Sequence, residues 1–228
     1  MALTGVVEPL RAGIKEIVDD AFVLACDLGQ SVDPTAVCVL QHRRISHMTI
    51  KGAVRPVSEQ FDVRHLERLP LGLSYPDQVD AIAGLLARPP LNSGCELVID
   101  ETGVGRAVGD LFDLARLKPT RVSITAGGEQ SCVGANRWHV AKQLLISSLD
   151  ARLHTGELRF AAELQDAGAM AEELKDFRRK VSVAGRYSYD ARVGKHDDLV
   201  LAVAIGLWVC SGRPKVPVAQ TGTFQLVM

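Results

Sequence analysis

Hydrophobic residues in this 228-residue chain gather in short apolar runs that are separated by polar and turn-forming residues. Apolar runs of about four to eight residues that are rich in Val and Ile are typical of buried strands. By this pattern we predict strands over 22–28, 35–41, 47–54, 96–100 and 121–125, with a short extended piece over 157–160.

Other stretches carry apolar residues three and four positions apart, which is the spacing of one helix face. This spacing predicts helices over 75–88, 106–115, 138–154, 162–179 and 199–210, and a hairpin over 181–189. Residues 10–18 are expected to form a helical turn or two, 61–74 to be irregular, and 126–137 to be a glycine-rich loop.

The order of these elements is three strands followed by alternating helices and strands, which predicts an α/β fold with a mixed central sheet flanked by helices. We expect one main domain over residues 21–212. Residues 1–20 would form an N-terminal lead-in and residues 213–228 a flexible tail.

Three acidic positions stand where apolar elements end or begin: Asp27, Asp100 and the pair Asp197-Asp198. A buried carboxylate is costly unless it is paired or holds a metal. If the strand over 22–28 lies beside the strand over 96–100, Asp27 and Asp100 are neighbours at one edge of the sheet. Carboxylates that converge in this way suit two Mg²⁺ or Mn²⁺ ions, the equipment for hydrolysing a phosphodiester bond.

Each acid also has a simpler interpretation. Asp27 would be a solvent-facing strand residue, Asp100 would start a turn, and the Asp197-Asp198 pair would cap a helix. Successive helical residues point about 100° apart, so the two acids of the pair cannot face an ion equally. We favour Asp198 as the third ligand, with Asp197 capping the helix or binding a second ion.

Three further polar residues are expected close to the ligands. Asp33 is expected to form a turn with Pro34, and a contact with the metal site is the alternative. Glu101 would point to the opposite face from Asp100 and support the site. His196 would orient a water or touch a metal, or else face solvent.

Positive charge is concentrated in one segment, although the chain as a whole has a net charge of −1. Residues 177–195 carry six basic side chains against one acid, and they lead directly into the third acidic motif. We predict that this segment guides a phosphate backbone, with a solvated charged hairpin as the alternative. The six are Arg178, Arg179, Lys180, Arg186, Arg192 and Lys195.

Several classes of protein are disfavoured by what the chain lacks. The five cysteines and six histidines have no zinc-ligand spacing. The longest apolar run, 199–210, is too short to cross a bilayer, and the N-terminus does not have the pattern of a secretion signal. We therefore expect no membrane association and a cytoplasmic location.

Three motifs also resemble a known family. Residues 27–36 (DLGQSVDPTA) resemble the first motif of the nuclease domain of phage terminase large subunits, 100–105 (ETGVG after Asp100) the second, and 194–199 (GKHDDL) the third. Residues 142–160 are similar to the helix and short strand between the second and third motifs. The resemblance implies an RNase H-like fold and two-metal cleavage of double-stranded DNA. It also implies partnership with the terminase ATPase domain, the small terminase subunit and the portal, in the host cytoplasm.

No GxxxxGK[ST] motif occurs, so we expect a nuclease domain without its ATPase. Other hypotheses remain open. One is another RNase H-like nuclease, such as a Holliday-junction resolvase or an RNase H. A second is a nucleotide-binding protein of the actin and sugar-kinase type, which would need another glycine-rich phosphate loop that the sequence lacks. A third is a non-catalytic DNA-binding or assembly module, which would have no need of the acids.

Overall fold

The computed structural model of the chain describes residues 14–49, 51–103, 106–161, 163–176, 178–181, 187–190 and 196–211. Its strands are β1 (Ile14–Asp27), β2 (Ala36–Thr49), β3 (Val54–Arg68), β4 (Cys95–Asp100), β5 (Thr120–Thr125), β6 (Gln130–Gly134), β7 (Arg137–Ala141), β8 (Leu158–Phe160), β9 (Arg178–Val181) and β10 (Tyr187–Asp190). Its helices are α1 (Tyr75–Leu86), α2 (Arg106–Leu114), α3 (Lys142–Thr155), α4 (Ala167–Asp176) and α5 (Asp198–Ser211), with a 3₁₀ turn over Leu91–Ser93.

Eight strands form one mixed sheet in the order β6-β7-β5-β4-β1-β2-β3-β8, and β9 and β10 form a separate hairpin. β1 runs parallel to β4, and β4 to β5, whereas β2 runs antiparallel to both β1 and β3. β1, β3, β4 and β5 therefore point the same way, and their carboxyl ends meet at one edge of the sheet. This edge is where ligands bind in open α/β sheets.

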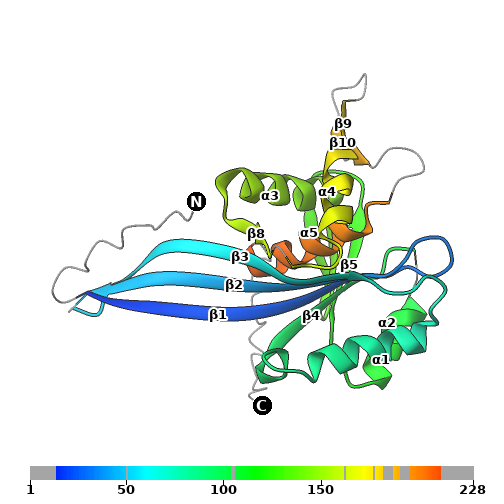
Figure 1. Cartoon of the computed structure of the whole chain (residues 1–228), viewed down its shortest axis with the longest axis horizontal. Coiled ribbons are helices and arrows are strands. Elements are labelled where there is room, and N and C mark those ends of the chain that lie inside the picture. The colour runs from blue at the N-terminus through cyan, green and yellow to red at the C-terminus, as the bar shows by residue number, and fades with distance from the viewer. Residues whose placement is uncertain are drawn as a thin grey trace, which may run out of the picture.

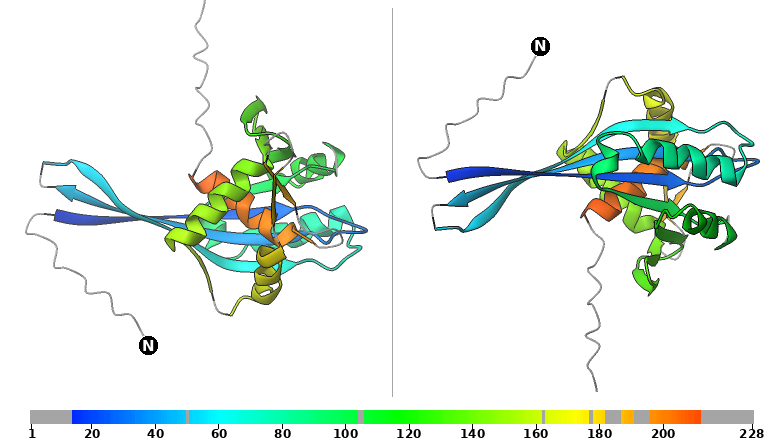
Figure 2. Two further views of the ribbon diagram at one scale, coloured as in Figure 1. Left: turned by 90° about the horizontal axis from the view of Figure 1, so that it is seen from above. Right: turned by 90° about the horizontal axis from the view of Figure 1, so that it is seen from below.

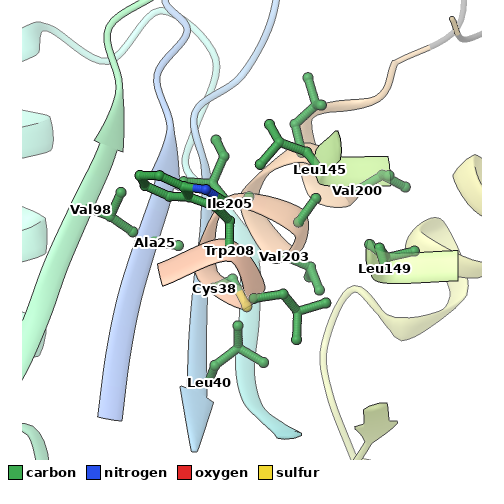
Figure 3. Packing of buried hydrophobic residues seen from close by; sticks show 14 of the residues in the cluster. Ala25, Cys38, Leu40, Val98, Leu145, Leu149, Val200, Val203, Ile205 and Trp208 are labelled. Carbon is green, nitrogen blue, oxygen red and sulfur yellow. The ribbon is translucent and has the colours of Figure 1, made fainter. Parts of the chain in front are cut away.

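Helices cover both faces of the sheet, with α3, α4 and α5 on one side and α1 and α2 on the other (Figure 1). The alternation of side chains along a strand supplies a core to each face. In β1, Val23 and Ala25 pack toward α5, whereas Leu24 and Cys26 belong to the core shared with α1 and α2. The first of these cores is shown in Figure 3.

The last long helix, α5, is buried along nearly its whole length, from Asp198 to Trp208. A helix that is apolar on every side is suited to the interior, and α5 packs between the sheet and helices α3 and α4. The long helix predicted over 199–210 is thus confirmed. None of the helices that the structure describes is long and apolar enough to cross a membrane.

The N-terminal meander differs from the sequence prediction. The predicted strand over 47–54 is wrong, because these residues end β2, turn, and begin β3. The predicted irregular stretch over 61–74 is wrong up to Arg68, and the helical turn expected over 10–18 is wrong from Ile14 onward. Three long strands result, which extend together beyond the helices (Figures 1 and 2).

Three other boundaries were also mispredicted. The loop expected over 126–137 contains the edge strand β6, and the first residues of the helix expected over 138–154 form β7. The helix expected over 162–179 is shorter, since α4 ends at Asp176 and β9 follows. The α/β class, the mixed sheet and the pairing of the first strand with the fourth are confirmed.

Candidate active site

Two carboxylates meet at the carboxyl edge of the sheet. Asp27 is the last residue of β1 and Asp100 is the last residue of β4, and the two are direct partners in the parallel strand pair. The residues just before both acids are apolar and buried, 23–26 in β1 and 97–99 in β4, so the acids stand at the point where the core opens to the surface. The predicted adjacency of Asp27 and Asp100 is confirmed.

Asp100 is buried and held in place by the turn that follows it. The backbone N–H and the hydroxyl of Thr102 both donate to Oδ1 of Asp100, at 2.8 and 2.5 Å. The same hydroxyl oxygen accepts a bond of 2.6 Å from the backbone N–H of Ile124 in β5. The side chain of Asp100 is therefore tied to two strands, which fixes its orientation beside Asp27.

The second pair of acids reaches this edge from α5. Asp197 and Asp198 stand at the start of the helix and, with Asp27, they line a cavity of about 530 Å³. The same cavity is lined by Tyr75 and His196, by residues 28–34 and by Thr102 and Gly103. Three acidic motifs that are far apart in the sequence thus converge on one open cavity.

A glycine permits the loop that forms the rim of this cavity. A Cβ at Gly29 would lie 2.1 Å from the backbone oxygen of Asp33, so no larger residue fits the turn. The loop is pinned from below by the buried Gln78, whose Nε2 donates to the backbone oxygen of Gly29 at 2.9 Å. Thr35 adds a second tie, since its hydroxyl lies 2.7 Å from Oε1 of Gln78 and 2.9 Å from the backbone N of Gly29.

The acids perturb one another's protonation. Loss of water around Asp27 raises its pKa well above the usual range, and the charges of Asp100, Asp197 and Asp198 raise it further. Burial also raises the pKa of Asp100 to about 6, although the hydrogen bonds from Thr102 oppose this rise. Gathering these carboxylates away from water is thus unfavourable without a positive charge between them, which favours a bound cation.

Two basic side chains approach the acidic pair on α5. The ammonium of Lys142, the first residue of α3, lies 2.8 Å from Oδ2 of Asp197. The guanidinium of Arg68, the last residue of β3, donates through Nε to Oδ2 of Asp198 at 2.6 Å, and its other branch contacts Glu173. Burial raises the pKa of Glu173 to about 7, while its bond from the Val200 N–H opposes this rise.

The donor set fits a divalent cation. Among the described residues, no three His, Cys, Asp or Glu side chains already lie close enough together to hold one ion. Carboxylate oxygens are nevertheless the ligands that Mg²⁺ and Mn²⁺ prefer. Burial, together with the charges of Asp100, Asp197 and Asp198, disfavours the ionised form of Asp27. A cation bound between these carboxylates would replace their mutual repulsion with attraction.

The fold has known counterparts. The crystal structure of the large terminase nuclease from thermophilic phage G20c with bound magnesium is similar to this chain, with a TM-score of 0.55 and 21% identity over 83% of this chain and 81% of that one. The large terminase nuclease domain of Thermus phage P74-26 is also similar, with a TM-score of 0.52 and 18% identity over 82% and 78% of the two chains. The chain has the fold of a large terminase nuclease domain. This confirms the predicted RNase H-like fold.

Beyond the three motifs, the likeness to terminase nucleases is one of fold. No family model matches the chain, and no curated protein matches it. The terminase nuclease fold is therefore retained here at an identity of about one residue in five. At this distance the comparison supports the architecture, and the chemistry must be argued from the side chains themselves.

Of the three residues predicted to lie near the ligands, two line the cavity and one does not. Asp33 and His196 both line the cavity, where Nδ1 of His196 lies 3.2 Å from Oδ1 of Asp33. Glu101 instead accepts a bond of 3.2 Å from Arg137 in β7. Both the predicted direction of Glu101, opposite to Asp100, and its supporting role stay predictions.

The predicted DNA-binding segment is only partly described. β9 and β10 form the expected hairpin, which carries Arg178, Arg179 and Lys180 in its first strand. Arg186, Arg192 and Lys195 lie outside the described residues. The role of all six in binding DNA stays a prediction.

Sequence reasoning missed four residues at the site: Arg68, Thr102, Lys142 and Glu173. Thr102 could have been found, because a hydroxyl two residues after an acid commonly bonds back to it. Arg68 was hidden in a stretch that was predicted to be irregular. Lys142 and Glu173 lie in predicted helices, where a single charged residue is ordinarily solvated, and no local signal distinguishes them.

Proposed function

We propose that this chain is a metal-dependent endonuclease that hydrolyses the phosphodiester bonds of double-stranded DNA. The observation that carries the proposal is the register pairing of Asp27 with Asp100 at the edge where α5 presents Asp197 and Asp198. The likeness to terminase nucleases, one of them crystallised with magnesium, supports the same conclusion.

Asp27, Asp100, Asp198 and Asp197 would hold two Mg²⁺ or Mn²⁺ ions. Such ions supply an acidified water for in-line attack and stabilise the leaving 3′ oxygen. The chain's own contribution is to hold these acids in place. Thr102 fixes Asp100. The burial of α5 fixes the position of the helix start, where Asp197 and Asp198 stand.

The open cavity is suited to a polymer rather than to an enclosed small molecule. Its rim, residues 28–34, is held by Gln78, and Asp27, Asp197 and Asp198 line the cavity together with Tyr75. A phosphate backbone could then enter from the side of the β9–β10 hairpin, whose basic residues would neutralise it. Cleavage would tolerate any sequence, because contacts with phosphates carry no base information.

In this proposal the nuclease would act within a DNA-packaging machine. A terminase ATPase domain would move the DNA, a small terminase subunit would recognise it, and a portal would receive it, all in the host cytoplasm. These partners rest on the family resemblance of the three motifs. The likeness of the fold to terminase nucleases is consistent with them.

The test is cleavage of supercoiled plasmid by the purified protein with Mn²⁺, with Mg²⁺ and with EDTA. We expect cleavage with either ion and none with EDTA. Asp27→Ala and Asp100→Ala should each reduce the rate at least about 100-fold, because bound metal supplies several kcal/mol of transition-state stabilisation and each 1.4 kcal/mol is tenfold. Asp80→Ala, which removes an exposed acid from α1, is the matched control and should cleave normally.

Full activity in either site variant would contradict the proposal. The choice among nuclease types is made with the same protein on three substrates of equal length: linear duplex, a four-way junction and an RNA–DNA hybrid. Preference for duplex supports the terminase-like function. Preference for the junction or the hybrid would replace it with a resolvase or an RNase H.

A further inference from the structure

Arg68 stands at the same edge of the sheet as the acids, because β3 runs parallel to β1 and ends there. Its Nε donates to Oδ2 of Asp198 at 2.6 Å, whereas its NH2 group is 3.4 Å from Oδ1 of the same carboxylate. The strong bond therefore engages Oδ2. Among the residues that the structure describes, Oδ1 carries only the long contact from Arg68, and it lies 3.8 Å from Nδ1 of His196, a residue that lines the cavity.

Arg68 is itself held by a network that includes the helix bearing Asp198. The side chain of Glu173 in α4 contacts the guanidinium of Arg68 through Oε1 and accepts a bond of 3.0 Å from the Val200 N–H through Oε2. The backbone N–H of Arg68 donates to Oδ2 of Asp166 at 2.8 Å. Glu173 and Asp198 are each about 6% exposed at the side chain. The guanidinium and the first turn of α5 are thus fixed to one another through buried groups.

We propose that Arg68 is a positioning residue that fixes Asp198 by its Oδ2, so that Oδ1 is presented to a divalent cation in the cavity. The inference rests on the proposed function, since it takes Asp198 to be a metal ligand. It also assigns a role to Arg68, which lies outside the three acidic motifs. The two oxygens of Asp198 would then have different partners, Arg68 for Oδ2 and the cation for Oδ1.

The physical reason is the burial of the carboxylate. Asp198 is almost fully enclosed, and its neighbours on α5 are apolar. Without Arg68, Asp198 and Glu173 would both lose their cationic partner in a site already crowded with acids. The Asp198 side chain would then be free to rotate away from its position, which removes a metal ligand. Groups that orient metal ligands typically alter metal affinity about 10- to 100-fold.

The experiment measures Mn²⁺ binding by calorimetry in the full chain, without DNA, beside urea denaturation in EDTA. The variants are Arg68→Gln, Arg68→Lys and Arg64→Gln. Arg64 is the matched control because it is an exposed arginine on the same strand. We expect Arg68→Gln to weaken Mn²⁺ binding about 10- to 100-fold. Arg68→Lys, which keeps the charge but not the fork, should lose less, and Arg64→Gln should bind as the wild type does.

A double variant, Arg68→Gln with Glu173→Gln, guards against failure to fold, because it removes one of the two buried acids that the single variant leaves without a cationic partner. The double variant should show the same loss of Mn²⁺ affinity. If Arg68 were only structural, its loss would lower the resistance to urea while the folded protein bound Mn²⁺ unchanged. Unchanged or tighter binding in a folded Arg68 variant would therefore overturn the inference.

Binding and cleavage separate this inference from the proposed function. A wild type that binds Mn²⁺ but cuts no DNA contradicts the nuclease function. In that case the Mn²⁺ affinities of the Arg68 variants still test the inference. A wild type that cuts DNA but shows equal Mn²⁺ affinity with and without Arg68 supports the function and overturns the inference.

Discussion

Asp27 and Asp100 are held in an environment that disfavours their charge. An unfolded aspartate has a pKa of about 3.9, whereas that of Asp100 in the folded protein is about 6. Between these values the folded protein binds more protons than the unfolded chain does. Stability therefore falls as the pH rises through this window, which is the opposite of the usual effect of a salt-bridged aspartate.

We expect Asp100→Asn to remove part of this pH dependence, because the amide keeps an oxygen for Thr102 and carries no charge. In EDTA, the wild type should lose on the order of 2 kcal/mol more unfolding free energy than the variant between pH 4 and pH 7. The measurement is urea denaturation across that range, with Asp80→Asn as the control. If the unfolding free energies of wild type and Asp100→Asn changed in parallel with pH, the raised pKa would not belong to Asp100.

At the scale of elements, the position of the acidic pair depends on how closely α5 approaches the sheet. Gly206 faces β1 and β2, where an added Cβ would lie 2.5 Å from Leu40 and 3.2 Å from Ala25. Both partners are fully buried in the core shown in Figure 3. The absence of a side chain at 206 therefore lets α5 lie flat on the sheet, with its first turn at the carboxyl edge.

This close approach predicts opposite effects of the same substitution at two helical glycines. Gly206→Ala should lower the unfolding free energy by about 1 to 3 kcal/mol through overpacking. Gly84→Ala, in α1 with nothing within 4 Å of the added Cβ, should raise it by about 0.5 to 1 kcal/mol through helix propensity. Urea denaturation followed by tryptophan fluorescence measures both, since Trp138 and Trp208 are buried edge to face, with ring centroids 5.5 Å apart. A stabilised Gly206→Ala variant would contradict the close packing.

At the scale of the whole molecule, the charges nearly cancel, with a net charge of −1. A nearly neutral protein does not attract DNA by its overall field, so affinity must come from a local concentration of positive charge. The segment over residues 177–195, which leads into the third acidic motif, has such a concentration, with six basic side chains against one acid. Its first strand, β9, pairs with β10 as an antiparallel hairpin.

We expect Arg178→Ala with Arg179→Ala to weaken DNA binding and to reduce the slope of log affinity against log salt by about one to two units. The measurement is fluorescence anisotropy with a labelled duplex at several salt concentrations and with Ca²⁺ in place of Mg²⁺. The control is Arg116→Ala with Lys118→Ala, which removes two exposed charges beside a separate hollow of about 440 Å³. Equal slopes in the two double variants would exclude the hairpin as the DNA guide.

Local pattern was sufficient for much of the fold. Apolar runs that end in an acid predicted β4 and the second half of β1, whose first half was mispredicted, and the wholly apolar run after Asp198 predicted α5. These predictions succeeded because a buried strand or helix needs a continuous run of apolar residues, and such a run is visible in the local sequence. The boundaries of β2, β3, β6 and β7 were mispredicted, because these strands contain polar residues. Polar residues are tolerated in a strand that pairs with neighbouring strands, and they give no local strand signal.

The sequence by itself determined which residues could carry the chemistry: Asp27, Asp100 and the pair on α5 end or begin elements that their own neighbours dictate. Only the tertiary structure decided what holds those residues. Arg68 and Asp198 are 130 positions apart, and their ion pair exists because β3 ends and α5 begins at the same edge of the sheet. Such a contact depends on the path of the chain between the two residues, and no local pattern of polar and apolar positions encodes it.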